Sequence, residues 1–450
     1  MSNPLLILAG EATAWRDRPL LPEVERHARR ALLDWMGALL AGCQRAPATL
    51  IAKALNDTST SNGAYCYVTG RKVALRQAAL VNATASHTVE FDDIYRDAGY
   101  HPGAPTIAAA LAAAQATGSC MDEFLRAIIA GYEVSCRIGL AVQPSHYKFW
   151  HTTGTVGTFG AASATALLLG ASDSQQAHAL ALAATMASGL QQAFRGEGMS
   201  KPLHAGHAAE AGALAAMLAV EGVTGALDVL DGPSGFAAAT SEDTGKWEAA
   251  FEGLGAQPVI CNITFKNYGC CGHIFAALDG LGELCAQHAF KAADIERIDV
   301  GGYSATKQVC DRPLAATEQD CRFSTQYCLA ALLVLGGVRL DAFEPEALNN
   351  SSIRELMPRI YVTLDPELTE AYPRRRAARV SVHLKDGRTL SIFQPTRKGD
   401  PDAPLSDDDL FDKFRELALP TVSLEVAENL RQKVMKGHQI PMKIPLLESS

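Results

Sequence analysis

The 450-residue chain lacks the segments that direct a protein to or across a membrane. Its N-terminus, MSNPLLILAGEATAWRD, has no basic region, and its apolar run is too short for a signal peptide. The longest apolar stretches, such as ALAAMLAV (213–220), are far too short to cross a bilayer. We therefore expect a cytoplasmic protein with no membrane partner.

Organised cysteines and an excess of basic residues are also missing. The 11 cysteines include no CxxC pair, so neither a zinc ribbon nor a ferredoxin-type cluster is supported. Without a secretory signal, the odd number predicts reduced thiols. The formal net charge of −9 argues against a nucleic-acid partner, which would require a basic face. That charge still permits a local cationic pocket for a small anion.

The pattern of apolar residues changes from helical to strand-like and back along the chain, which predicts two domains. Hydrophobic residues make up 48% and charged residues 20%, as in soluble globular proteins. From about residue 20 to about residue 260, apolar and alanine positions recur at helical spacing. The predicted helices there cover 23–43, 76–93, 104–118, 121–142, 155–170, 174–194 and 198–219.

Near residue 290 the pattern becomes that of strands. Alternating segments predict strands at 295–303, 359–365, 378–384 and 388–393, with a helix over 323–337. Asp386-Gly387 predicts a hairpin turn between the last two strands, and helices return over 405–418 and 423–435. The fold class is therefore a large all-α helical domain plus a smaller inserted α+β domain. We place the helical domain at 1–262 and 400–450, and the α+β domain at 263–399.

The stretch HTVEFDDIYRDAGYHPGAP (87–105) gathers acids and histidines between apolar segments. If residues 87–93 are helical, Glu90 and Asp93 share a face and His87 lies one turn earlier. Such carboxylates could bind Mg²⁺ or Ca²⁺, perform acid/base chemistry with His101, or solvate a helix end.

Three further clusters carry polar groups beside apolar helices. Lys201, in GMSKPLHAGHAAEAG, could bind a carboxylate, act as a desolvated base, or lie on the surface. His151 precedes two threonines at a helix start, which suits an anion or a simple N-cap. Lys266 and His273 flank the adjacent Cys270-Cys271 pair, which would chelate a single metal ion poorly.

Taken in this order, the clusters resemble the MmgE/PrpD family, which includes 2-methylcitrate dehydratase, cis-aconitate decarboxylase and iminodisuccinate epimerase. The motifs that carry the resemblance are HTVEFDD…HPGAP, GYEVSCRIG, WHTTGTVGTFGAA, MSKPLHAGHAAEAG, VLDGPSGF and KNYGCCGH. The resemblance implies an active site between the two domains, a homodimer, small di- or tricarboxylate substrates, and no required metal or cofactor. By motif position we assign catalytic roles to His101, Lys201, His151 and Glu90. The substrate-binding candidates are Lys266, His273, Tyr327 and Asp93.

Departures from the family pattern bear on the reaction. Glu90 replaces the first aspartate of the family's Asp-Phe-Asp-Asp, and Ile94 stands where the decarboxylase branch has threonine. Cys271 aligns with a histidine of the decarboxylase. These changes weaken a decarboxylase interpretation.

The chemistry that the family shares is proton removal next to a carboxylate, with cations stabilising the enediolate. We predict a 2-methylcitrate dehydratase-like hydro-lyase of propionate metabolism. The alternatives are an epimerase of a substituted succinate, a cis-aconitate-type decarboxylase, and a non-catalytic carboxylate-binding protein. Aconitase-like iron–sulfur chemistry is a weaker alternative.

Overall fold

A computed structural model describes residues 3–55, 60–61, 63–194 and 198–447. The chain divides into two compact units, a helical unit of Met1–Thr264 with Asp407–Ser450 and an α+β unit of Phe265–Ser406. The predicted fold class is confirmed. None of the described helices is both long and apolar enough to cross a membrane.

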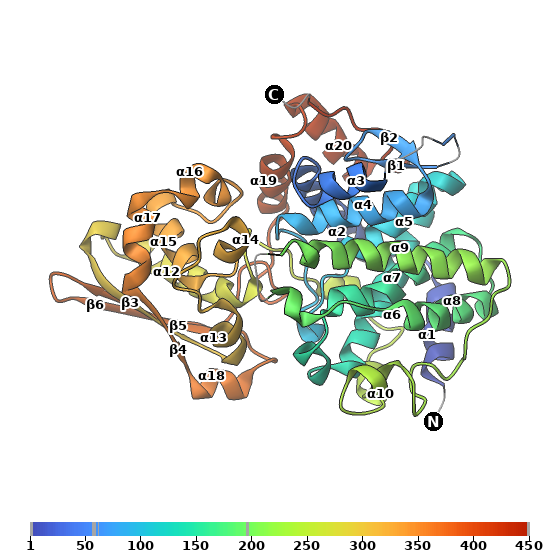
Figure 1. Ribbon diagram of the computed structural model, residues 1–450, viewed down its shortest axis with the longest axis horizontal. Helices are drawn as coiled ribbons and strands as arrows, with labels where there is room; N and C mark the ends of the chain where they lie inside the picture. The colour runs from blue at the N-terminus through green and yellow to red at the C-terminus, as the bar shows by residue number, and fades with distance from the viewer. Residues whose placement is uncertain (1–2, 56–59, 62, 195–197, 448–450) are drawn as a thin grey trace. The chain divides into compact units, whose positions relative to one another are not determined.

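The helical unit is built around closely packed alanine-rich helices. Figure 1 shows α4, α7 and α9 side by side, and their contacts agree with that view. Gly212 explains the close approach of α9 to α7, because a Cβ there would lie 2.4 Å from the Thr158 carbonyl oxygen. The helices of this unit are α1 Pro4–Ala14, α2 Pro22–Gly42, α3 Ala48–Leu55, α4 Leu75–Thr88, α5 Gly103–Thr117, α6 Met121–Val142, α7 Thr152–Leu168, α8 Asp173–Met186, α9 Ser200–Val220, α10 Phe236–Thr240, α11 Trp247–Ala250, α19 Asp407–Ala418 and α20 Leu424–Lys436.

Two helix predictions extend too far, and one hairpin was not predicted. α4 ends at Thr88, so the placement of Glu90 and Asp93 on one helical face is wrong. Glu90 has a φ of 57°, a left-handed conformation that a right-handed helix cannot continue through. α8 likewise ends at Met186, well before residue 194. The hairpin of β1 (Ala64–Cys66) and β2 (Arg71–Val73) interrupts the helices.

The C-terminal helices belong to the helical unit because buried contacts fasten them to α2. Lys413 of α19 donates to Asp34 of α2 at 2.5 Å. From α2, Arg29 donates to the Val434 carbonyl of α20 at 2.7 Å. These contacts join segments almost 400 residues apart.

The α+β unit contains a four-stranded sheet in the order β4-β3-β5-β6. Its strands are β3 Ile295–Gly302, β4 Ile360–Leu364, β5 Ala378–Leu384 and β6 Thr389–Gln394, and β3–β4 is the parallel pair. The predicted strands and the hairpin are confirmed, with Gly387 at a φ of +89°. α12 packs on β5 and β6. The helices of this unit are α12 Phe275–Gln287, α13 Ser304–Cys310, α14 Glu318–Cys321, α15 Thr325–Leu335, α16 Pro345–Leu348, α17 Ser351–Leu356 and α18 Pro366–Ala371.

Candidate active site

Three of the predicted clusters meet inside the helical unit. The side chains come from the last turn of α4, the segment between α4 and α5, the residue that precedes α7, and the first turn of α9. The group comprises His87, Glu90, Asp92, Asp93, His101, His151, Lys201 and His204. All of them except His101 and His204 are buried.

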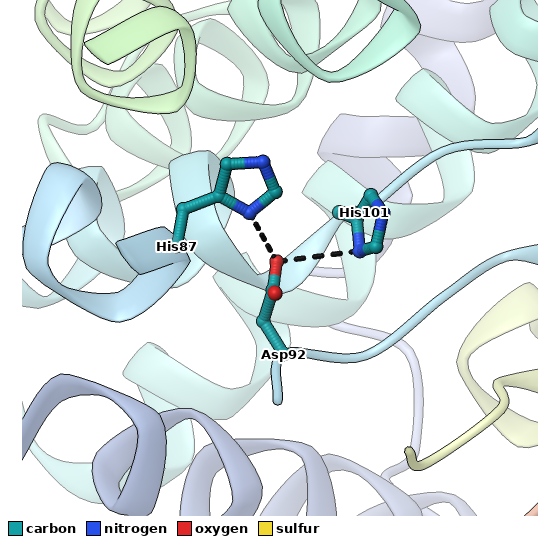
Figure 2. A group of neighbouring side chains, drawn as sticks. All are labelled: His87, Asp92 and His101. Atoms are coloured by element: carbon teal, nitrogen blue, oxygen red, sulfur yellow. Dashed lines mark hydrogen bonds and ion pairs between the residues drawn. The ribbon is translucent and has the colours of Figure 1, made fainter. Parts of the chain in front are cut away.

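Asp92 bridges two imidazole rings (Figure 2). Its Oδ2 atom lies 2.6 Å from His87 Nδ1 and 3.3 Å from His101 Nδ1. Burial alone would raise the pKa of Asp92, but the interactions with the two histidines hold that pKa well below its usual range. Asp92 is therefore a buried carboxylate with an imidazole on each side.

His101 is the more accessible of the two rings. Its side chain is 16% exposed, whereas the side chain of His87 is fully buried. His101 Nδ1 also lies 2.8 Å from the Asp93 carbonyl oxygen, which fits an N–H on that nitrogen. Its Nε2 atom then remains available to exchange a proton with a bound molecule.

His87 and His151 are buried and neutral. Burial lowers the pKa of His87 to about 4, and burial with the nearby His87 and Lys201 lowers the pKa of His151 well below its usual range. The two rings stack at 5.6 Å, and His151 Nδ1 lies 3.0 Å from His204 Nδ1. The Nε2 atoms of His87 and His151 have no hydrogen-bond partner among the described residues.

Lys201 and Glu90 form a buried ion pair next to these rings. The two residues are 1% and 2% exposed, and the Lys201 ammonium also lies over the Phe194 ring at 5.6 Å. Two charges withdrawn from water in this way are costly unless they stay paired. Glu90 pairs with Lys201 from a left-handed backbone conformation that side chains other than glycine rarely adopt. Strain of this kind is concentrated at functional sites.

Asp93 is bonded to the protein through both carboxylate oxygens. Oδ1 accepts from the Gly103 N–H at 2.9 Å, and Oδ2 accepts from the Tyr132 hydroxyl at 2.7 Å. Burial raises the pKa of Asp93 to about 7, although both hydrogen bonds lower it. These contacts give Asp93 a clear task, which is to hold the first turn of α5 beside His101. Its predicted role in substrate binding stays a prediction.

The spacing of His87, Asp92 and His101 raises the question of a metal. One ligand atom from each lies within 4.8 Å of the others, and imidazole with carboxylate is a donor set that zinc uses. However, the 2.6 Å separation of His87 Nδ1 and Asp92 Oδ2 is that of a hydrogen bond. The group as it stands is arranged for hydrogen bonding rather than ligation.

The predicted site residues of the α+β unit are placed as follows. Lys266 is 1% exposed. His273 Nδ1 lies 2.8 Å from the Tyr303 hydroxyl, and the Tyr327 hydroxyl donates to the Ala342 carbonyl at 2.6 Å. The Tyr327 bond fastens α15 to a neighbouring turn within its own unit. The roles assigned to these three residues stay predictions.

Sequence reasoning missed several residues that shape the site. It gave no role to Asp92 or Tyr132, although Asp92 lies inside the motif that was singled out. It also missed Lys413, which donates to Asp34 at 2.5 Å and to the Phe91 carbonyl at 2.8 Å. No local pattern links Lys413 to a loop 322 residues away.

Comparison with known proteins assigns the family. The MmgE/PrpD N-terminal domain matches residues 8–248, and the MmgE/PrpD C-terminal domain matches residues 268–436. The chain belongs to the MmgE/PrpD family. The predicted resemblance is therefore confirmed, and both family domains are present.

Curated relatives of this MmgE/PrpD protein carry decarboxylase names. The cis-aconitate decarboxylase-like protein oryM of Aspergillus oryzae is 29% identical over 92% of this chain and 90% of its own. Human cis-aconitate decarboxylase is 29% identical over 78% of this chain and 74% of its own. The Aspergillus terreus cis-aconitate decarboxylase is 26% identical over 84% and 82%.

Proposed function

We propose that this protein is a lyase that acts on a small di- or tricarboxylate by proton transfer at a carbon next to a carboxylate. The observation that carries the proposal is the partly exposed His101, whose Nδ1 atom lies 2.8 Å from the Asp93 carbonyl oxygen and 3.3 Å from the buried carboxylate of Asp92. A carboxylate behind an imidazole fixes its orientation and stabilises the imidazolium that forms when it takes a proton. His101 is thus the proposed acid/base.

Lys201 is the proposed cationic group for a substrate carboxylate or an enediolate. It is buried and paired with Glu90, so a bound anion would share the ammonium with Glu90. Positive charge in such a dry environment stabilises developing negative charge more strongly than in water. His151 would contribute to the same site through its Nε2 atom, which has no hydrogen-bond partner among the described residues.

Decarboxylation is the first reaction to test, because the relatives described above are named cis-aconitate decarboxylases or cis-aconitate decarboxylase-like. In that reaction the bond to the leaving carboxylate breaks, carbon dioxide departs, and His101 in its protonated form delivers a proton to carbon. Dehydration of a 2-methylcitrate-like substrate is the second candidate, because Ile94 and Cys271 depart from the decarboxylase pattern. There a neutral His101 removes the proton before the hydroxyl leaves.

The two candidates are separated by a nuclear magnetic resonance time course with cis-aconitate and 2-methylcitrate. Decarboxylation gives carbon dioxide and a product with one carbon fewer, whereas dehydration gives an alkene with all carbons retained. Deuterium exchange of a substituted succinate in D₂O without a new alkene would identify an epimerase. Thermal stabilisation by these acids without any turnover would contradict the proposal and indicate a carboxylate-binding protein.

The pH dependence of kcat provides a second discriminator. A decarboxylase that needs protonated His101 loses activity as the pH rises, whereas a dehydratase that needs neutral His101 loses activity as the pH falls. A profile without either limb would contradict the role of His101. We further propose that the protein is a cytoplasmic homodimer. Light scattering on the purified protein tests the dimer, because it measures the molar mass of the particle in solution.

A further inference from the structure

We propose that His87 is a positioning residue, whose Nδ1–H fixes the Asp92 carboxylate that in turn holds His101. This inference rests on the proposed function, in which His101 transfers the proton. It deepens that function by assigning a task to a buried histidine that the sequence analysis left without a role.

The geometry shows the connection through one oxygen atom. Asp92 Oδ2 faces both rings, at 2.6 Å from His87 and at 3.3 Å from His101 (Figure 2). The rings are 5.0 Å apart and lie at 66° to each other, so neither stacks on the other. The shorter contact fixes the carboxylate, which then presents Oδ2 to His101 Nδ1 beside the Asp93 carbonyl oxygen at 2.8 Å.

His87 is suited to be the fixed member of the group. It lies in the last turn of α4, whereas Asp92 and His101 lie in the irregular segment between α4 and α5. Its side chain is fully buried and stacks on His151 with the ring planes 20° apart. A group on a regular helix with a locked ring is a more precise support than a loop.

The neutral state of His87 fits this task. Burial lowers its pKa to about 4, so near neutral pH the ring has one N–H, and the 2.6 Å contact places it on Nδ1 facing Asp92. A donor on Asp92 stabilises this carboxylate most when His101 has lost its proton. Removing the donor should therefore make the Asp92–His101 pair keep its proton to higher pH. The titratable residues near His101 are Asp92, Asp93, His87 and His151, and Lys201 in turn acts on His87 and His151.

Two substitutions separate the two nitrogens of His87. His87→Asn places an amide N–H where Nδ1 stands and has nothing in place of Nε2, whereas His87→Leu removes both. For His87→Leu we expect kcat to fall by about tenfold to a hundredfold, with KM changed by less than about threefold. In the pH profile of kcat, the change in activity assigned to His101 should occur at higher pH. His87→Asn should restore kcat to within about threefold of the wild type, and its pH profile of kcat should match that of the wild type.

His146→Leu is the matched control. His146 is also a buried histidine of the helical unit with a pKa lowered to about 4 by burial, but its partners are Thr240 and Thr155. Its loss should leave the pH limb in place. If His87→Asn is as inactive as His87→Leu, Nε2 performs the chemistry and the proposal is overturned. An unchanged kcat in His87→Leu overturns it too. Should His87→Leu not fold, His87→Phe keeps a ring against His151.

A second readout needs no substrate. Diethyl pyrocarbonate modifies neutral imidazoles, and mass spectrometry of the full chain follows His101 across the pH range. The His101 curve should move to higher pH in His87→Leu and stay in place in His146→Leu. If the wild type turns over neither acid, the proposed function fails, while this curve still decides the positioning role. An unmoved curve in His87→Leu overturns that role.

Discussion

Two buried lysine–carboxylate pairs hold the segment between α4 and α5 of the helical unit, and they differ in the backbone conformation of the residues that they join. Lys413–Asp34 joins two regular helices, and Lys413 also donates to the Phe91 carbonyl. Lys201–Glu90 joins the start of α9 to a residue with a φ of 57°. The first pair links unstrained elements and holds the loop, whereas the second requires a strained backbone beside three histidines. Under the proposed function, Lys413–Asp34 is a structural pair and Lys201–Glu90 is a functional pair.

The largest effect should come from Lys201→Met. Activity should fall by about a thousandfold, because the cation that would bind the substrate carboxylate is gone. Because the substitution also leaves Glu90 buried without its cation, the activity is compared per folded molecule, with the folded fraction measured by circular dichroism and urea denaturation. A variant that retains wild-type kcat/KM would place Lys201 with Lys413 as a structural residue.

Lys413→Met should affect stability instead. It leaves Asp34 buried without its cation, and breaking such a pair costs about 3–5 kcal/mol. Urea denaturation measures the loss. The activity per folded molecule should fall by less than about tenfold, because Lys413 contacts the loop at Phe91, which is not a member of the proposed acid/base group. A thousandfold loss of kcat in well-folded Lys413→Met would erase the distinction between the two pairs.

Asp93 is an acid of the same loop, but its hydrogen-bond donors are neutral, whereas Glu90 and Asp34 are each paired with a lysine. Its folded pKa of about 7 lies above the value of about 4 expected for an unfolded chain. The folded state therefore binds the proton more tightly, and this contribution to stability declines as the pH rises from about 4 to about 7. Asp93→Asn should flatten the decline, which urea unfolding at pH 5 and pH 8 would measure. Parallel curves for the two proteins would contradict the shift.

The smallest effect is expected from metal removal. Dialysis against EDTA should leave kcat unchanged within error, because His87 and Asp92 are already joined by a hydrogen bond at 2.6 Å. Zinc added back to the treated protein serves as the control. Activity that vanishes with EDTA and returns with zinc would make the His87–Asp92–His101 group a metal site.

The sequence predicted the features that depend on local pattern. Periodicity predicted α6 and the strands β3 to β6, and the motif positions identified His101, His151 and Lys201 as candidate site residues. It could not predict that α4 stops at Thr88, because the stop depends on the left-handed backbone of Glu90 and its distant partner Lys201. Contacts across more than 300 residues, such as Lys413 with Phe91, leave no local trace in the sequence.

The role of His101 is the central claim, and one measurement tests it most directly. Wild-type protein and His101→Asn would each be incubated with cis-aconitate and with 2-methylcitrate, and product formation followed by nuclear magnetic resonance. We predict turnover of one of the two acids by the wild type and a loss of at least about a hundredfold in His101→Asn, with both proteins folded. Equal turnover by the two proteins would contradict the account.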